Sequence, residues 1–200
     1  MKNEKRVDDY IWLHDYITKI QDRLLFSQEL SDAMLDFKNL IIETRNKGGR
    51  IFFAGNGASE TISSHAALDY NNQLAVKTTS INNSSIITCF ANDFGYEQIF
   101  SRYLKLNACK DDVVVLISSS GKSQNVINAA YDAHKIGMKV VSFTGFDKNN
   151  TLHSLANIGF WIDSNVYNVV ETIHMIWLVA VCDLIAMEEK DLIGVHGKNI

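Results

Sequence analysis

The residues best suited to do chemistry form one short segment, 118–123, in which four hydroxyls surround a glycine: Ser118, Ser119, Ser120 and Ser123. The segment follows an apolar run, 113–117, and precedes a helical pattern. Backbone N–H groups at a helix start and the positive end of the helix dipole favour a phosphate group. The segment therefore predicts an anion site. The alternative is a plain turn with Ser123 as helix N-cap, which explains one serine better than four.

A second turn, Gly55-Asn56-Gly57-Ala58-Ser59, also follows a strand pattern and opens a helix. The dinucleotide pattern GxGxxG is not met, because Glu60 stands where the third glycine belongs. No acidic residue clearly ends the next strand to hold a ribose, so we expect no nucleotide cofactor. Glycines that let the backbone approach a smaller ligand explain the turn better. A tight turn in which Asn56 bonds its own backbone is the alternative.

Two pairs of ionisable residues lie on predicted helices. His65 and Asp69 are four residues apart and share a helix face just after the second turn. Glu171 and His174 are three apart on a very apolar helix, where a carboxylate either pairs, takes up a proton or works. At each pair a structural contact and a functional site are both open. A third polar group, Asn92-Asp93, predicts either a functional corner or an Asx-type turn.

The order of apolar runs and helical patterns indicates how these residues are positioned. Five strand patterns alternate with helices, which predicts a doubly wound parallel sheet between helical layers, a three-layer αβα sandwich. The predicted strands are 50–54, 75–81, 113–117, 139–144 and 158–162. The predicted helices of the core follow the two turns, span 84–91, 95–106 and 123–136, lie near residue 152, and end with 168–189.

Two amphipathic helices are predicted ahead of the sheet, over 8–26 and 28–45. The first has an apolar stripe at 3-4-3-4 spacing, which suits a cap on the domain or a subunit interface. The stripe contains Tyr10, Leu13, Ile17, Ile20 and Leu24. Since no linker divides the chain, we predict one domain over 1–200, with a helical pair at 1–48, a core at 49–189 and a tail at 190–200.

Composition excludes several classes of protein. The formal net charge of −4 and the lack of a long basic run give no reason to expect nucleic acid or a membrane surface as a partner. The most apolar stretch, 173–187, is too short to span a bilayer. The N-terminal residues lack the apolar core of a signal peptide. Three widely spaced cysteines, Cys89, Cys109 and Cys182, predict reduced thiols in a cytoplasmic protein.

Taken in order, these motifs resemble a known family. The segments FFAGNGASETISSHAALD, FANDFGYEQIF, VLISSSGKSQNVINAA, VVSFTG and VETIHMIWLVAVCDLI are similar to the SIS (sugar isomerase) fold, and more narrowly to its phosphoheptose isomerase group. The resemblance spans roughly residues 50–185. It implies aldose–ketose isomerisation of a sugar phosphate, most directly sedoheptulose 7-phosphate to D-glycero-D-manno-heptose 7-phosphate, in heptose or surface-polysaccharide biosynthesis.

The resemblance also implies roles for matching positions. The serine turn would hold the sugar phosphate, and further substrate contacts would come from Asn56, Gly57, Ala58, Ser59, Asn92 and Asp93. His65 matches a zinc ligand. Asp69 falls where the group has a catalytic Glu that also binds zinc, and Glu171 falls where it has a Gln. The implied proton-transfer residues are Asp69 and Glu171, and the implied metal ligands are His65, Asp69 and Glu171, with one zinc per site.

One departure separates two hypotheses. Val179 stands where the isomerases have a catalytic His that also binds the metal. This favours a non-catalytic module that binds a sugar phosphate or a protein partner such as a replication initiator, whereas the carboxylates at Asp69 and Glu171 favour catalysis. The resemblance further implies a homotetramer with sites at subunit interfaces.

Overall fold

The computed structural model describes residues 2–189, with side chains from residue 6 onward, so the predicted tail at 190–200 lies outside the described residues. The described part forms eight α-helices, one short 3-10 helix and five strands. In chain order they are α1 (Lys2–Arg23), α2 (Gln28–Asn46), β1 (Arg50–Gly55), α3 (Ala58–Leu74), β2 (Lys77–Ser80), α4 (Ser84–Phe94), η1 (Tyr96–Gln98), α5 (Ile99–Asn107), β3 (Val113–Ser118), α6 (Gln124–Ile136), β4 (Lys139–Thr144), α7 (Thr151–Leu155), β5 (Ile158–Trp161) and α8 (Tyr167–Glu188).

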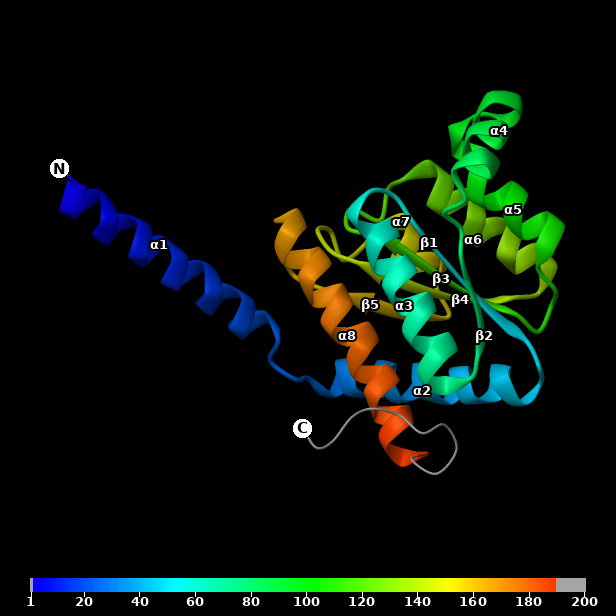
Figure 1. Cartoon of the computed structure of the whole chain (residues 1–200), viewed down its shortest axis with the longest axis horizontal. Helices are drawn as coiled ribbons and strands as arrows, with labels where there is room; N and C mark the ends of the chain where they lie inside the picture. The colour runs from blue at the N-terminus through cyan, green and yellow to red at the C-terminus, as the bar shows by residue number, and fades with distance from the viewer. Residues whose placement is uncertain (1, 190–200) are drawn as a thin grey trace.

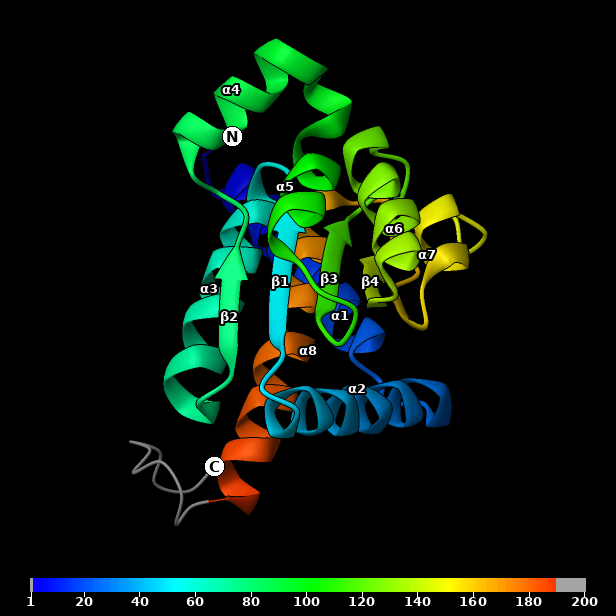
Figure 2. The same ribbon diagram turned by 90° about the vertical axis from the view of Figure 1, so that its right-hand side faces the viewer.

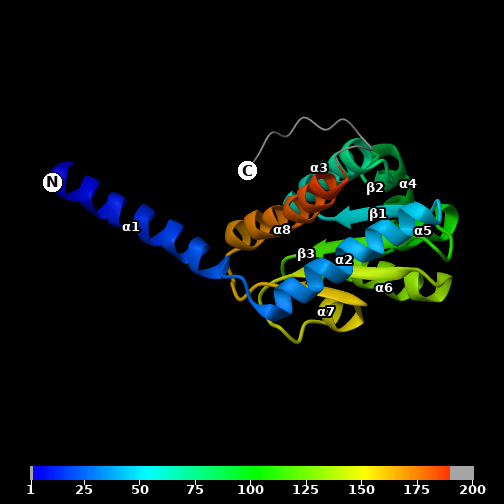
Figure 3. The same ribbon diagram turned by 90° about the horizontal axis from the view of Figure 1, so that it is seen from below.

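The five strands form one parallel sheet in the order β2-β1-β3-β4-β5. Figure 2 shows the arrows of the strands pointing the same way, with α4 beyond their tips. Figure 3 shows the sheet between α3 and α8 on one face and α5, α6 and α7 on the other. The predicted αβα sandwich with a doubly wound parallel sheet is confirmed.

Strand residues alternate between two apolar cores, because successive side chains of a strand point to opposite faces. Ile51 and Phe53 of β1 pack with α2, α3 and α8, whereas Phe52 and Ala54 pack with α5, α6 and α7. Both faces of β1 and β3 are buried, which explains the continuous apolar runs at these strands.

Local signals fix several helix ends. The Oγ of Ser27 accepts the N–H of Leu30 at 3.1 Å and caps α2, and the Oδ1 of Asn83 accepts the N–H of Ile86 at 3.1 Å and caps α4. Gly137 ends α6 with φ +92°, as expected of a C-cap glycine.

Three expectations from the sequence need correction. The pair Asn92-Asp93 lies inside the last turn of α4 and forms no separate corner, since the helix continues to Phe94. The first helix begins at Lys2, well before residue 8. The apolar stretch 173–187, expected to be too short to span a bilayer, is part of α8, which has 22 residues and is long and apolar enough to cross a membrane by length and composition. However, 56% of the most apolar window of α8 is buried inside the domain, as in a core helix.

A buried carboxylate ties α5 to α6. Asp132 accepts hydrogen bonds from Ser101 and from Lys135 (2.9 Å), and Lys105 lies 2.8 Å away. Burial alone would raise the pKa of Asp132, but these partners outweigh it and lower the pKa to about 2. Because the folded pKa lies below the unfolded one, the group stabilises the fold above about pH 4, and this contribution is lost as the pH falls toward 2.

We therefore expect Asp132→Asn to lower the free energy of unfolding at pH 7 by about 2 kcal/mol, and by roughly half as much at pH 3. Urea unfolding at both pH values measures this difference. Asp147→Asn is the control, because this carboxylate is exposed and, within the described residues, accepts just the backbone N–H of Asn149 (2.9 Å). An equal loss for Asp132→Asn at both pH values would contradict the assignment.

Candidate functional site

The site is placed by the order of the strands. In a doubly wound sheet, ligands bind beyond the carboxyl ends of strands at the point where the order reverses. Here that point lies between the neighbours β1 and β3, since the chain continues outward from β1 to β2 on one side and from β3 to β4 on the other. The turn after β1 contains Asn56 and Gly57, and the turn after β3 contains the four serines. The structure thus brings both predicted turns to one edge of the sheet.

The serine turn holds its hydroxyls close to one another. The Oγ atoms of Ser118 and Ser123 are 3.3 Å apart, and the Oγ of Ser120 accepts the backbone N–H of Lys122 at 3.3 Å. Ser123 occupies the N-cap of α6, but in the described structure its side chain makes no capping hydrogen bond. The turn is therefore not explained by helix capping alone.

Ser119 gives the sharper indication of a ligand. Its side chain is buried, and within residues 2–189 its Oγ has no hydrogen-bond partner. Buried hydroxyls in proteins are normally paired, so such an atom needs an explanation. Its backbone carbonyl accepts the N–H of Gly145 at 2.8 Å, which fixes the turn to the end of β4. A bound oxyanion would supply the missing partner.

The turn after β1 depends on glycine. Gly57 has φ +58° and ψ −123°, a backbone conformation that residues with a Cβ rarely adopt. It is followed at once by α3, whose first residue is Ala58 and whose second, Ser59, is buried. The positive end of α3 therefore opens onto the same edge as the serine turn.

A feature that the sequence did not indicate connects the two turns. The amide of Asn56 pairs reciprocally with that of Asn125 on α6, at 2.9 Å and 2.8 Å. The hydroxyl of Tyr96 donates to the Oδ1 of Asn56 at 2.9 Å. Asn125 is 2% exposed. The signal for Asn125 in the sequence is weak, a polar residue at the start of an apolar helix.

The predicted contact between His65 and Asp69 on α3 is present. The Nε2 of His65 lies 3.0 Å from the Oδ2 of Asp69. Helices α3 and α8 lie side by side in front of the sheet (Figure 1), and the buried hydroxyl of Tyr70 donates to the carbonyl of Leu178 at 2.9 Å. On α8, burial together with the carboxylates of Asp69 and Asp183 raises the pKa of the Cys182 thiol to about 12.

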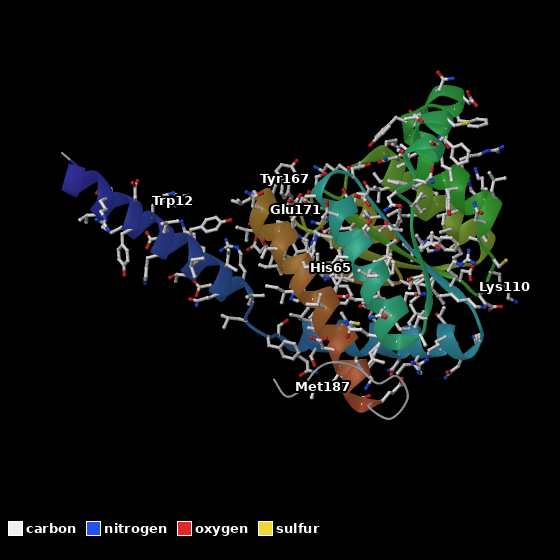
Figure 4. All side chains as sticks on the ribbon, viewed as in Figure 1. Trp12, His65, Lys110, Tyr167, Glu171 and Met187 are labelled. Carbon is white, nitrogen blue, oxygen red and sulfur yellow. The ribbon has the colours of Figure 1, made fainter. Side chains whose placement is uncertain are left out.

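The two residues of the second predicted pair, Glu171 and His174, have different roles in the structure. His174 is fully buried and its Nε2 donates to the carbonyl of Thr144 at 3.1 Å, which makes it a link between α8 and β4. Burial lowers the pKa of His174 to about 4, so the ring is neutral. Glu171 remains partly exposed near the start of α8 (Figure 4), and partial burial raises the pKa of its carboxyl. A carboxyl with a raised pKa suits proton transfer.

Asn92 and Asp93 lie on α4, an outlying helix without buried residues. Their side chains are exposed and bond each other at 2.9 Å, from the Nδ2 of Asn92 to the Oδ1 of Asp93. Figure 1 shows α4 standing above the body of the domain. The structure therefore places this pair beyond the strand ends but does not bring it into contact with the two turns.

The donor side chains near His65 do not complete a zinc site within the described residues. Catalytic zinc sites usually have three protein ligands and one open position. His65 and Asp69 lie together, but within the described part of the chain no three His, Cys, Asp or Glu side chains are grouped closely enough to hold a metal. Val179, partly buried on α8, offers no donor. Within residues 2–189 of a single chain, the donors therefore fall one ligand short of a zinc site.

Comparison with known proteins gives consistent results. Residues 15–145 match the family described as the SIS domain. The chain is 33% identical to a phosphoheptose isomerase of Sodalis glossinidius over 80% of this chain and 83% of that protein. It is 34% identical to one of Glaesserella parasuis over 64% and 76%. A solved phosphoheptose isomerase of Neisseria gonorrhoeae matches with a TM-score of 0.78 at 23% identity, over 94% of this chain and all of that one.

Proposed function

The chain belongs to the SIS domain family, within the phosphoheptose isomerase group, and on that premise we propose that it isomerises sedoheptulose 7-phosphate to D-glycero-D-manno-heptose 7-phosphate. The product would serve heptose or surface-polysaccharide biosynthesis. The observation that carries the proposal is the buried Oγ of Ser119, which has no hydrogen-bond partner among the described residues. Its turn and the turn that contains Asn56 lie together where the strand order reverses. One turn would bind the phosphate and the other would hold the sugar beside it.

The chemistry needs one group that moves a proton between neighbouring carbons. A base removes a proton from C1 of the ketose, an enediolate forms, and the proton returns to C2, while the proton of the C1 hydroxyl moves to the oxygen of C2. Glu171 supports this role because its carboxyl is partly exposed and has a raised pKa. Asp69, held by His65 at 3.0 Å, is the second carboxylate on the neighbouring helix and would take the complementary proton-transfer step.

The direct test is a coupled assay with sedoheptulose 7-phosphate on metal-stripped protein, repeated with added zinc. Turnover in either condition supports the isomerase, and dependence on zinc supports the metal. A thermal shift with the same sugar phosphate, measured in parallel, reports binding without catalysis. Absence of turnover in both conditions would contradict the proposal.

A second candidate function follows from Val179. This residue stands on α8 where the resemblance implies a catalytic His. If the chain binds sugar phosphates and does not turn them over, it is a binding module that senses a sugar phosphate or docks on a protein partner. A ligand-induced thermal shift without turnover distinguishes this candidate from the enzyme.

One zinc per site stays a prediction, and no step above depends on it. His65 and Asp69 would provide two ligands, and Glu171 the third if it closes on them in the assembled protein. Metal analysis that finds about one zinc per chain, lost in His65→Ala, would support the site. Zinc retained by His65→Ala would show that any bound metal lies elsewhere.

We also propose that the chain forms a homotetramer in the cytoplasm. Helix α1 projects away from the body of the domain (Figure 1), and its stripe residues Tyr10, Leu13 and Ile17 are each more than half exposed. An isolated helix is marginally stable in water and gains most of its stability by burying an apolar face. The α1 helices of other copies of this chain would provide that face.

We expect Ile17→Glu to reduce the assembly to smaller species, because it places a charge in the centre of the stripe. Light scattering after size-exclusion chromatography measures the mass. Lys19→Glu is the matched control, since the same new side chain on the opposite side of α1 leaves the stripe intact. A tetramer that survives Ile17→Glu, or a wild type that is monomeric, would contradict the role of α1.

A further inference from the structure

The amide pair that joins the two turns has a fixed orientation. The backbone N–H of Val126 is shared between the carbonyl of Ser123 at 3.1 Å and the Oδ1 of Asn125 at 3.0 Å, and a donor this close to the amide favours its oxygen over its NH₂ group on that side. The same Oδ1 accepts the Nδ2 of Asn56, so the amide of Asn56 must present its oxygen to the Nδ2 of Asn125. The backbone of α6 therefore determines how both side chains face.

The hydrogen bonds already made by the amides of Asn56 and Asn125 determine what these two side chains can offer a ligand. An amide side chain has two N–H donors and an oxygen that accepts two hydrogen bonds. The oxygen of Asn56 accepts from Asn125 (2.8 Å) and from Tyr96 (2.9 Å), and the oxygen of Asn125 accepts from Asn56 (2.9 Å) and from Val126 (3.0 Å). Both oxygens are thus filled, while each NH₂ group has used one of its two N–H bonds.

We infer that Asn125 is a positioning residue that makes this corner of the site donate hydrogen bonds only. By holding the amide of Asn56, it directs the remaining N–H of Asn56 toward a substrate oxygen and prevents the amide from turning its carbonyl there. This inference rests on the proposed isomerase function. A carbonyl oxygen of the sugar that becomes an enediolate oxygen gains negative charge, and fixed N–H donors stabilise that charge most.

Tyr96 has a supporting part. Its hydroxyl fills the second lone pair of the Asn56 oxygen from η1, a segment next to α4 that is held to α6 by the Nδ2 of Asn128 and the carbonyl of Glu97 (2.9 Å). Tyr96 is more than half exposed, so its hydroxyl can be removed without opening the core. This gives a second, independent way to disturb the same amide.

The test uses Asn125→Ala, Tyr96→Phe and a matched control, Asn157→Ala. The Oδ1 of Asn157 accepts the N–H of Val140 at 2.8 Å at the start of β4. This contact lies at the amino ends of the strands, whereas the site lies beyond their carboxyl ends. In Asn125→Ala the N–H of Val126 keeps a partner, the carbonyl of Ser123 at 3.1 Å. For each variant kcat, KM, the inhibition constant of inorganic phosphate and the melting temperature are measured.

We expect Asn125→Ala to lower kcat on the order of 10- to 100-fold, because the Asn56 donor is no longer aligned. The inhibition constant of inorganic phosphate should stay within about 2-fold, since the serine turn is unchanged. Tyr96→Phe should lower kcat by roughly 3- to 10-fold, the usual worth of one hydrogen bond. Asn157→Ala should lower only the melting temperature.

Several results would overturn the inference. If Asn125→Ala has an unchanged kcat and a lower melting temperature, it behaves like the control, and Asn125 has a structural role only. Equal losses of turnover and of phosphate binding would mean that Asn125 shapes the serine turn. If Asn125→Ala does not fold, an unchanged kcat in Tyr96→Phe decides against the inference.

Failure of the isomerase proposal is recognised separately, because wild-type protein would then show no turnover. The inference is in that case judged by thermal shifts with sedoheptulose 7-phosphate and with inorganic phosphate. Asn125→Ala must lose the extra shift that the sugar gives over phosphate alone. A variant that keeps this extra shift, or a wild type that never shows one, overturns the inference.

Discussion

Glu171→Gln is expected to lower kcat for sedoheptulose 7-phosphate by about 10²- to 10⁴-fold, the usual contribution of a general acid–base group. Gln keeps the shape and hydrogen bonding of the side chain but cannot take up a proton. A base works in its ionised form, and partial burial raises the pKa of Glu171 above the ordinary value. Wild-type kcat should therefore fall as the pH decreases through this raised pKa, and the variant should lack that decrease.

Glu188→Gln is the matched control, because it makes the same change at the far end of α8, where Glu188 pairs with Lys38. Surface pairs of this kind contribute about 0–1 kcal/mol to stability, so kcat should be unchanged. The comparison is informative because Gln is the residue that the family resemblance implies at position 171. A Glu171→Gln variant with full turnover would exclude this carboxylate from the proton transfer and leave Asp69 as the candidate.

Gly121→Ala is expected to remove phosphate binding and to lower the free energy of unfolding by about 3 kcal/mol. Gly121 has φ +63°, and an added Cβ would lie 1.9 Å from the Oδ1 of Asn150. That oxygen is already engaged, because it accepts the N–H of His153 at 2.9 Å and caps α7. Either the serine turn or the start of α7 must move.

Urea unfolding and the inhibition constant of inorganic phosphate measure the two effects. Gly48→Ala is the control that separates backbone strain from collision, since Gly48 has φ +72° and an added Cβ there meets nothing within 4 Å. It should cost stability, by about 1 kcal/mol, and leave phosphate binding unchanged. If Gly121→Ala binds phosphate like wild type, the turn is not the phosphate site.

The sequence predicted the core of the fold because its local signals agree with one another. The run 113–117 with its serine turn corresponds to β3 and the N-terminus of α6, and Gly137 ends α6 as expected. The predicted corner at Asn92-Asp93 is wrong because polar residues mark turns and also occur in the exposed last turn of a helix such as α4. Strand patterning does not show how far an outlying helix continues.

The sequence predicts the parts of the candidate site whose residues are close together in the chain. It does not predict the parts that are formed by tertiary contacts. The serine turn and the pairing of His65 with Asp69 follow from residue spacing, and both appear in the structure. The contact of Asn56 with Asn125 joins residues 69 positions apart, so no spacing rule could find it. The same applies to His174, whose partner is a carbonyl on β4, thirty residues away.

The edge strands of the sheet have a consequence for how copies of this chain can meet. An exposed edge offers unpaired N–H and C=O groups to any other strand and invites aggregation. Here both edges are short: β2 and β5 have four residues each, β2 is the polar sequence KTTS with Lys77 exposed, and β5 contains Gly159. Such edges resist continuation of the sheet from one molecule into the next, so a crowded solution of this protein should stay free of strand-mediated fibres.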